Sequence, residues 1–448
     1  MAKANTELPQ VGARLNYSGN LGTIRFVGHV DNTQGIWLGV EWDNPRRGKH
    51  DGVKDGRKYF SCIIPNSGSF IRPSPAISYG RSFLTALVAK YVELPHGISE
   101  RVILGSSGGA IEVEAVGLDK IRGNLCHLER LREVSLDNEG VSSADTPGTI
   151  ERTCPGIRGL DLSKSLIPSW EVVSHIVSEL PNLQRLALNQ NRLRPPEPMD
   201  FGTLAFLNLT ELQLNATMTT WPELRGIISR IPKLQLIESG YNHLRELSSE
   251  ESASQPQEVN TILKILNLDG NELYSWSGVC ASLQPFTALE RLIVSSNCIE
   301  RIDAPVNAST SPLSSLRHAT LSFNRLKIWR DIDHIPLWCP ALESLTLSGN
   351  PLVEDPHLGK NARQFAIAKI PSLLVLDGAA ISLKERTDSE LFYLSYISKH
   401  ESSDEAIRNR EHLQWKALCE KHGKPDSPLP AGQHRADTLN SRLIGQRL

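Results

Sequence analysis

The stretch L-E-S-L-T-L-S-G-N-P-L at residues 342–352 decides the fold, because similar stretches recur at a nearly constant step. L-Q-R-L-A-L-N-Q-N-R-L at 183–193 and L-K-I-L-N-L-D-G-N-E-L at 263–273 keep the same spacing of apolar residues and Asn. Nine such stretches, separated by 25 to 29 residues, start at Leu131, Ile157, Leu183, Leu209, Leu234, Leu263, Leu289, Leu316 and Leu342. A period of this length indicates a solenoid, in which each repeat buries its apolar face against its neighbours.

The repeated pattern resembles the leucine-rich repeat, L-x-x-L-x-L-x-x-N-x-L. A short strand turns apolar residues such as Leu186 and Leu188 inward, and an Asn eight residues after the start can satisfy backbone groups where the chain turns. Six repeats have this residue, as Asn191, Asn242, Asn271, Asn297, Asn324 and Asn350, whereas Glu139, Ser165 and Thr217 replace it in the others. We predict an α/β leucine-rich-repeat solenoid over residues 131–383.

Two further sets of residues recur within the repeats. Trp170, Trp276 and Trp329 each lie thirteen residues after a start, which favours packing on the convex side over a ligand site. Alternate strand positions should face the concave side, and they are mixed in charge and mostly polar: Asp161, Arg185, Glu211, Gln213, Asn267, Arg291, His318 and Thr346. Such a surface suits a protein partner but equally suits solvent, so it identifies no contact.

The segments that flank the repeats have different compositions. Residues 81–130 are expected to form a linker and the start of the solenoid, and the charged, amphipathic residues 384–424 a helical cap. The run K-P-D-S-P-L-P-A-G at 424–432 has the composition of a linker. We therefore expect residues 425–448 to form a linker-like tail.

Residues 1–80 predict a small, strongly bent β domain. They contain eleven of the 32 glycines, interleaved with short apolar and aromatic runs. Their formal charge is +4, which leaves −6 for the rest of a chain whose net charge is −2. The N-terminal domain therefore suits an acidic partner.

Five motifs in this region, in order, resemble the CAP-Gly domain of cytoskeleton-associated proteins. They are G-T-I-R-F-V-G at 22–28, G-I-W-L-G-V-E-W-D at 35–43, G-K-H-D-G at 48–52, Y-F at 59–60 and G-S-F-I-R at 68–72. Members of that family bind acidic C-terminal tails that end in an aromatic residue and a free carboxylate, as on α-tubulin. The resemblance implies a groove with aromatic walls and a basic group for the carboxylates.

Transferred onto this sequence, the resemblance implies roles for eight residues. Lys49 meets acidic oxygens, Trp37, Phe60 and Phe70 form aromatic walls, and Phe26, Ser69 and Arg72 give supporting contacts. His50 stands where the family usually has Asn, and an imidazole cannot reproduce the donor and acceptor pair of an amide. We therefore expect an altered tail affinity that rises when His50 is protonated.

Structural roles compete for some of these positions. Trp37 and Phe26 are equally plausible as core residues of a small β domain. Gly48 and Gly52 are better explained as turn residues than as contacts, and Asp51 as a cap of that turn. Lys49 is the strongest candidate for a contact, because a lysine after a glycine of this loop has little structural reason to be there.

A CAP-Gly domain followed by leucine-rich repeats is similar to the tubulin-folding cofactor E family, over roughly residues 8–400. This resemblance implies a non-catalytic chaperone that binds the α-tubulin tail and the folded body during assembly or dissociation of the heterodimer. Other tubulin-folding cofactors would be partners. Members usually end in a ubiquitin-like domain, which we expect to be absent because Leu448 lies about where its first strand would begin.

Other classes of function have less support. A non-catalytic microtubule-binding adaptor is the main alternative, although no sustained heptad pattern is evident. No phosphate loop, H-E-x-x-H or G-x-S-x-G motif occurs, and G-S-S-G-G at 105–109 is better explained as a turn. Seven scattered cysteines indicate neither a disulfide framework nor a zinc site. We expect no catalytic residue, cofactor or metal.

Charge and hydropathy limit the partners and the location. A net charge of −2 argues against a general nucleic-acid binder. The chain has no run of 18 apolar residues, and M-A-K-A-N-T-E-L-P-Q at 1–10 lacks the apolar core of a secretory signal. We expect no membrane partner and a location in the cytoplasm and on the cytoskeleton.

Overall fold

The computed structural model describes residues 8–92, 102–104, 111–113, 128–195, 205–247, 262–305, 313–402 and 404–425. The G-S-S-G-G run, the linker-like tail and most of the polar loops between repeats lie outside the described residues. The chain divides into two compact units: Met1–Glu272 with Pro285–Ile293, and Leu273–Gln284 with Val294–Leu448. We call them the first and the second unit.

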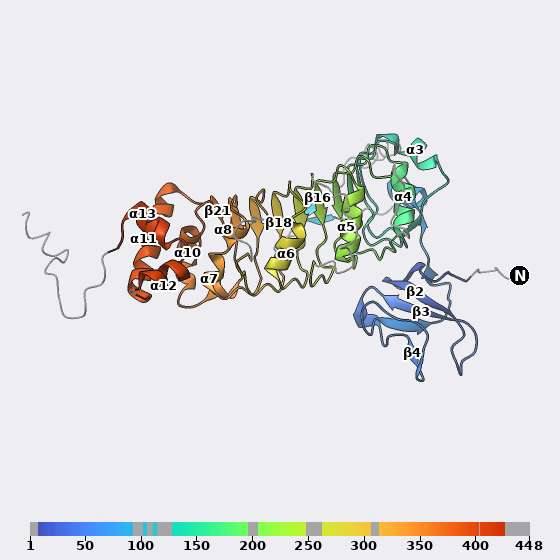
Figure 1. Ribbon diagram of the computed structural model, residues 1–448. Coiled ribbons are helices and arrows are strands. Elements are labelled where there is room, and N and C mark those ends of the chain that lie inside the picture. Colours follow the sequence, from blue (N-terminus) through green and yellow to red (C-terminus); the bar gives the residue numbers. More distant parts are fainter. Residues whose placement is uncertain are drawn as a thin grey trace, which may run out of the picture. The chain divides into compact units, whose positions relative to one another are not determined.

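The first unit begins with a β domain, in which Figure 1 labels β2, β3 and β4. Its sheet has five antiparallel strands in the order β6-β3-β2-β1-β7. These strands span β1 Arg14–Tyr17, β2 Asn20–Gly28, β3 Trp37–Trp42, β6 Gly68–Ile71 and β7 Ile77–Ser78. A 3-10 helix, η1 Pro45–Arg47, and a small hairpin of β4 Val53–Lys54 with β5 Arg57–Lys58 extend from the sheet. Its core consists of Leu15, Ile24, Leu38, Val40, Trp42 and Ile77.

The predicted solenoid is present as a row of parallel three-residue strands. In the first unit they follow chain order: β11 Glu133–Ser135, β13 Gly159–Asp161, β14 Arg185–Ala187, β15 Glu211–Gln213, β16 Leu236–Glu238, β17 Ile265–Asn267 and β18 Arg291–Ile293. Strands align in register, so that Leu186 pairs with Leu212. In most of these strands the central residue is buried and its two neighbours face outward, as the sequence pattern predicted.

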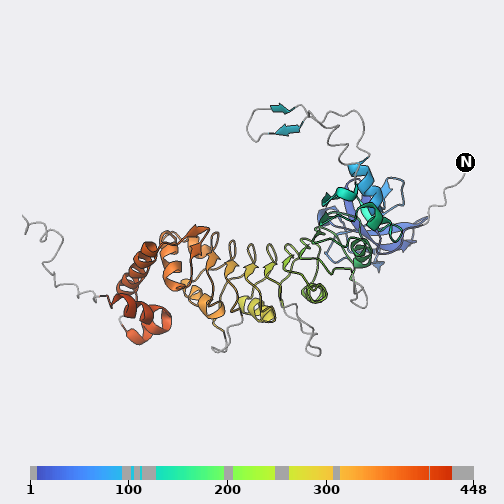
Figure 2. The ribbon, with the colours of Figure 1, turned by 90° about the horizontal axis from the view of Figure 1, so that it is seen from above.

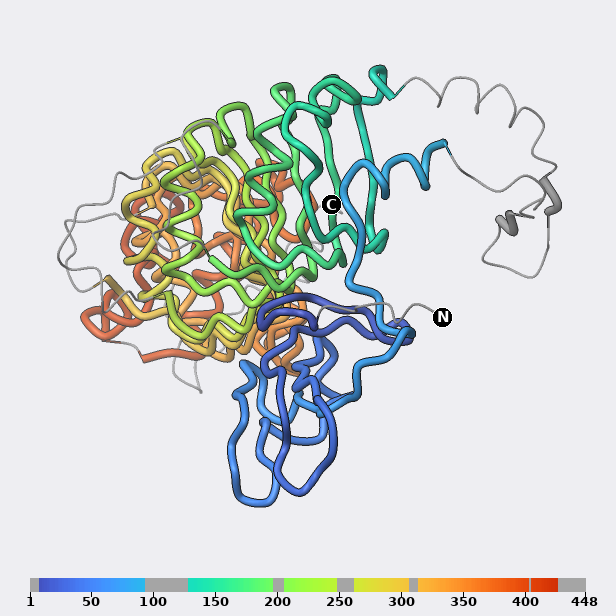
Figure 3. The backbone as a smooth tube through the Cα atoms, turned by 90° about the vertical axis from the view of Figure 1, so that its right-hand side faces the viewer, coloured from blue at the N-terminus to red at the C-terminus, as the bar shows by residue number. Residues whose placement is uncertain are grey.

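Helices occupy the opposite side of the repeats from the strands, as Figure 2 shows. α4 Trp170–Ser178 and α5 Trp221–Arg230 belong to the first unit, and the tube in Figure 3 follows the coil from strand to helix and back. α3 Thr149–Thr153 and η2 Leu128–Arg130 lie in the first repeats. Trp170 begins α4 and is 3% exposed, which confirms its predicted packing on the convex side.

The repeat Asn side chains form a buried ladder that links neighbouring repeats. Asn271 donates from Nδ2 to the carbonyl oxygens of Ser239 (3.0 Å) and Leu268 (2.9 Å). Its Oδ1 accepts from the backbone N–H groups of Asn242 (2.9 Å) and Leu244 (3.1 Å). The predicted role of this position, which is to satisfy backbone groups at the turn, is confirmed.

The first repeat uses another arrangement, because Glu139 stands at the Asn position. Its carboxylate accepts from Arg81 at 2.6 Å, and Arg81 also donates to the Glu139 carbonyl oxygen. Arg81 belongs to β8 Arg81–Ser82, which pairs in parallel with β12 Val141–Ser143. α1 Phe83–Tyr91 follows and buries Phe83, Ala86 and Leu87. A strand and a helix from residues 81–91 thus cover this edge of the repeats.

The second unit contains the last repeats and a helical cap. Its strands are β19 His318–Thr320, β20 Ser344–Thr346, β21 Val375–Leu376 and β22 Ala379–Ala380, of which the last pair is antiparallel. Its repeat helices are α6 Trp276–Leu283, α7 Trp329–Ile332, α8 Ile335–Trp338, α9 Pro351–Glu354, η3 Gly359–Asn361 and α10 Ala362–Lys369. Trp276 is buried, as predicted for the convex side, whereas Trp329 is only half-buried.

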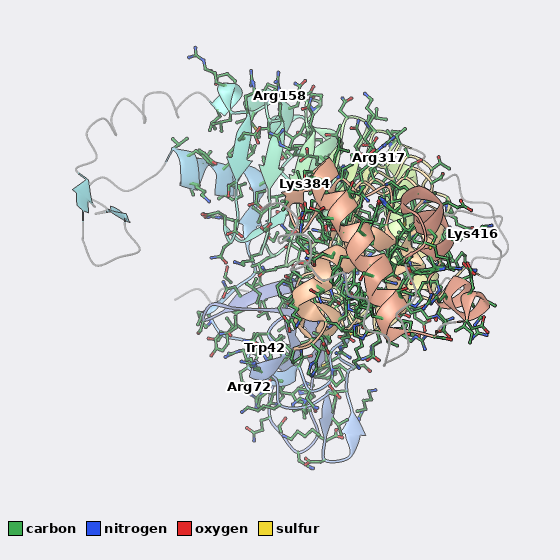
Figure 4. The ribbon with its side chains drawn as sticks, turned by 90° about the vertical axis from the view of Figure 1, so that its left-hand side faces the viewer. Trp42, Arg72, Arg158, Arg317, Lys384 and Lys416 are labelled. Carbon is green, nitrogen blue, oxygen red and sulfur yellow. The ribbon has the colours of Figure 1, made fainter. Side chains whose placement is uncertain are left out.

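The cap consists of α11 Leu383–His400, α12 Glu405–Glu411 and α13 Trp415–His422. Figure 4 labels Lys384 at the start of α11 and Lys416 on α13. Buried apolar residues join the cap to the last repeat helix: Phe365, Ala368, Tyr393, Leu394, Ile397, Trp415 and Leu418. Such a cover shields the apolar residues that a solenoid end would expose. In the described part of the chain, no helix combines the length and apolar character needed to cross a membrane.

Candidate functional site

A cavity of about 410 Å³ lies in the N-terminal β domain. Its lining residues come from the loop after β2, β3, η1, the 48–52 loop, β4 and β6: Val30, Trp37, Trp42, Arg47, Lys49, His50, Lys54, Ser69, Phe70 and Ile71. Trp42 is labelled in Figure 4. We call this cavity the groove. It brings together five of the eight predicted contact residues: Trp37, Lys49, His50, Ser69 and Phe70.

Backbone pairing holds the 48–52 loop against β6. The N–H of Lys49 donates to the Gly68 carbonyl oxygen at 2.8 Å, and the N–H of Gly68 donates to the His50 carbonyl oxygen at 2.9 Å. Gly48 is required here because a Cβ atom would lie 2.1 Å from the Asn66 carbonyl oxygen. Asp51 accepts a hydrogen bond from the Asn66 N–H, so it ties the 48–52 loop to the turn before β6 rather than capping its own turn, as the sequence had suggested. This packing orients Lys49 toward the groove.

The aromatic wall consists of rings that line the groove and rings that pack behind them. Trp37 and Phe70 line the groove in an edge-to-face pair with ring centroids 6.4 Å apart. The Trp37 indole N–H donates to Thr33 Oγ1 at 2.7 Å, which fixes the ring. Phe26 and Phe60 contact Phe70 from behind, at 6.2 and 5.3 Å, and are not among the lining residues. They position the wall.

Cations surround this aromatic wall. Arg47 and Lys54 line the groove with Lys49, and the lining residues include no carboxylate. The Arg47 guanidinium lies over the Trp42 ring at 4.3 Å. Arg72 is not a lining residue; its guanidinium stacks on Trp37 at 3.8 Å and donates to the Ile36 carbonyl oxygen. Because its lining has cations and no carboxylate, the groove has a positive potential that suits carboxylates of a ligand.

Sequence reasoning missed Arg47 and Lys54 as lining residues. Arg47 lies in R-R-G-K at 46–49, and Lys54 follows G-K-H-D-G after one residue. Those positions would have identified both as neighbours of Lys49. Val30, Trp42 and Ile71 had no comparable signal, because apolar residues usually belong to the core.

The His50 side chain has a defined hydrogen bond inside the domain. Its Nδ1 accepts from the Gly52 N–H at 3.0 Å, and its ring lies 5.1 Å from that of Phe70. Partial burial lowers the pKa of His50, so the neutral imidazole is the form at neutral pH. Because Nδ1 accepts, the proton of the neutral ring is on Nε2, which leaves one N–H donor for a ligand.

The groove has the chemistry of a binding site for a peptide end. An aromatic side chain can pack against Trp37 and Phe70 while carboxylate oxygens meet the lining cations. Across the described residues, no group of three or more His, Cys, Asp or Glu side chains could hold a metal ion.

Comparisons with known proteins were made for the β domain and for the whole chain. The CAP-Gly domain family matches residues 11–76. A solved structure, "Bik1 CAP-Gly domain with ETF peptide from Bim1", is 35% identical over 14% of this chain and 75% of that chain, with a TM-score of 0.13.

Two curated relatives match nearly the whole sequence. "Tubulin-specific chaperone E" of Bos taurus is 35% identical over 434 residues, which is 93% of this chain and 80% of the relative. The Homo sapiens protein of the same name is 33% identical over 431 residues, again 93% and 80%. The chain, with its CAP-Gly domain, its leucine-rich repeats and its helical cap, belongs to the tubulin-specific chaperone E family.

Proposed function

We propose that the groove binds the acidic C-terminal tail of α-tubulin and that the repeats hold the folded body of tubulin. Family membership supports a role as a tubulin-folding cofactor. In this proposal the protein promotes assembly or dissociation of the heterodimer without catalysis or a bound cofactor. It works in the cytoplasm and on the cytoskeleton with other tubulin-folding cofactors.

One observation carries the tail-binding role. The groove combines two ring walls with three lining cations, and its lining contains no acid. An acidic tail that ends in an aromatic residue presents the complementary set: carboxylates for the cations and a ring for the wall. Phe26, Phe60 and Arg72 act in this proposal by positioning Phe70 and Trp37.

The test is a titration of the purified chain with an α-tubulin C-terminal peptide, with and without its terminal aromatic residue. Lys49→Ala and Trp37→Ala are each expected to weaken binding about tenfold or more, because each removes a charged or aromatic contact. Lys58→Ala is the matched control, since Lys58 is an exposed lysine of the same domain outside the groove lining.

The results separate the parts of the proposal. Dependence on the terminal aromatic residue and on both groove residues supports tail binding. Equal, weak binding by all variants would rule out the groove as the tail site. If whole tubulin still bound to the Lys49→Ala chain in that case, the repeats would be the primary tubulin site.

A further inference from the structure

A second cavity, of about 420 Å³, lies in the second unit between repeat helices and the helical cap. Its lining residues come from α7, α10, α11 and the end of α12 and include Trp329, Phe365, Tyr393 and Tyr396. Phe365 lies at the centre of this aromatic group, 5.3 Å from Trp329 and 5.0 Å from Tyr396 between ring centroids. We call this cavity the cap pocket. Its apolar walls suit a bulky apolar group.

A buried ion pair lies at one wall of the cap pocket. Lys369 lines the pocket and is 3% exposed, and its Nζ lies 2.5 Å from Asp333 Oδ2 and 5.0 Å from the Tyr393 ring centroid. Burial lowers the pKa of Lys369 and raises that of Asp333. Such a pair costs desolvation energy that apolar packing would avoid. Asp333 thereby offsets the charge of Lys369 at this wall of the cap pocket.

Two buried hydrogen-bond donors at the cap pocket have no partner among the residues that the structure describes. Tyr393 Oη lies 3.0 Å from His412 Nδ1, and burial lowers the pKa of His412 to about 4, so the ring is neutral. An imidazole nitrogen is a better acceptor than a phenol oxygen, so Tyr393 donates and the His412 proton is on Nε2. Within the described residues, His412 Nε2 and Trp329 Nε1 have no hydrogen-bond partner.

The position of Trp329 distinguishes it from other tryptophans. The indole N–H groups of Trp221 and Trp276 also lack a described partner, but those rings are 2% and 1% exposed in the core. Trp329 begins its helix at the same repeat position as Trp276, yet it is half-buried and lines the cap pocket. The Trp329 ring therefore borders the cap pocket, with its unpartnered indole nitrogen buried at that side.

The charges around the cap pocket limit the ligand further. Arg330 and Lys327 are exposed cations of the lining, and Glu401 and Glu411 are its acids. Burial is the main cause of the lowered pKa of His412; Lys369, Arg330 and Arg408 lower it further, and Glu411 raises it. The two glutamates would repel a run of acidic residues. A single negative charge fits these surroundings best.

We propose that the cap pocket binds the C-terminal residue of a partner chain, with a bulky apolar side chain between the aromatic walls and one free carboxylate toward Trp329, His412 and Arg330. The groove differs, because its lining has cations without acids and suits an acidic run. This second site does not depend on tail binding by the groove.

The experiment uses the full chain labelled with 5-fluorotryptophan, in which 19F spectra resolve Trp329 and Trp37 separately. Trp329→Phe and Trp37→Phe assign the two resonances. The probes are N-acetylphenylalanine, which has a free carboxylate, and N-acetylphenylalanine amide, which does not. We expect the acid to shift the Trp329 resonance in a saturable way and the amide to bind there about tenfold more weakly.

Arg330→Gln tests the recognition of charge at an exposed position that does not threaten the fold. This variant is expected to weaken binding of the acid at Trp329 about threefold and to leave binding of the amide unchanged. Arg325→Gln is the matched control, because Arg325 is an exposed cation outside the pocket lining.

Each outcome has one meaning. The inference is overturned if the acid leaves the Trp329 resonance unmoved, if acid and amide bind there equally, or if Arg330→Gln has no effect. A shift of Trp37 alone supports the groove and rejects the cap pocket. A shift of Trp329 alone, with the predicted variant effects, supports the cap pocket, and the groove is then judged by its own titration with the tail peptide.

Discussion

The CAP-Gly domain and the leucine-rich repeats both contain conspicuous sequence motifs, but the motif residues have opposite roles. In the CAP-Gly domain, Lys49 and Trp37 lie at the groove, where a ligand can reach them. In the repeats, Asn271 and its equivalents are buried and bond to backbone groups. A motif residue therefore indicates function only where the fold leaves its side chain unused, and the repeats' motif indicates stability.

The largest expected effect is on the repeats. Asn271→Ala removes four buried hydrogen bonds and leaves backbone groups of two repeats without partners. We expect a loss of about 3 kcal/mol in the free energy of unfolding, measured by urea denaturation. Arg291→Ala, at a concave strand position, is the control.

Lys49→Ala makes the comparison sharper. It should change the free energy of unfolding by no more than about 0.5 kcal/mol, because a solvent-accessible side chain is removed. The contrast between the regions would fail if Asn271→Ala were equally mild, or if Lys49→Ala were equally destabilising.

A second prediction concerns a contact between neighbouring repeats. Phe323 has φ +54° and is 65% exposed, and a Cβ atom at Gly349 would lie 2.3 Å from its ring. Gly349 itself has φ +72°, which disfavours any side chain. Gly349→Ala should destabilise the chain by roughly 2 kcal/mol.

The double variant separates the two causes. Adding Phe323→Ala to Gly349→Ala should recover the part of the lost stability that comes from contact with the ring. The part that comes from the backbone conformation of Gly349 should remain. No recovery in thermal or urea unfolding would mean that the ring moves away freely, and that the exposed aromatic is not held by the next repeat.

The third prediction uses the lowered pKa of His412. The pKa is about 4 in the folded chain and about 6.5 when unfolded, so the unfolded chain takes up the proton first as pH falls. This contribution to stability is complete above about pH 6.5 and is lost toward pH 4, by roughly 1 kcal/mol after solvent screening.

His412→Gln should flatten this part of the pH dependence of unfolding, whereas His357→Gln, at an exposed histidine, should not. An unchanged slope in the His412 variant would show that its imidazole is not held neutral beside Tyr393.

The smallest expected effect concerns His50. Because burial lowers its pKa, tail-peptide affinity should be flat from pH 8 to about 6.5 and rise about twofold to threefold below that range. Protonation adds a charge beside an acidic ligand but breaks the acceptor bond to the Gly52 N–H, which keeps the gain small. His50→Asn should remove the rise in peptide titrations. A rise that begins near pH 8, or that persists in the variant, would contradict this assignment.

Much of the fold was predictable because it repeats. The spacing of the repeat starts predicted where the strands lie, and the alternation around Leu186 predicted that the central residue of each strand is buried. Individual contacts were less predictable. Phe60 was expected to line the groove, but its ring packs over Gly39 of β3 and contacts Phe70, the residue of β6 that pairs with Gly39. Nothing in the sequence distinguishes a ring at the front of a wall from one behind it.

By itself, the sequence determined the repeat register, the Asn ladder and the motif that carries Lys49, because each depends on residues at short, regular spacing. Only the tertiary structure decided which residues share a cavity. Trp276 and Trp329 occupy the same repeat position, yet one is sealed in the core and the other lines the cap pocket. The physical reason is that local spacing sets the direction of a side chain, whereas the element packed against it sets its burial.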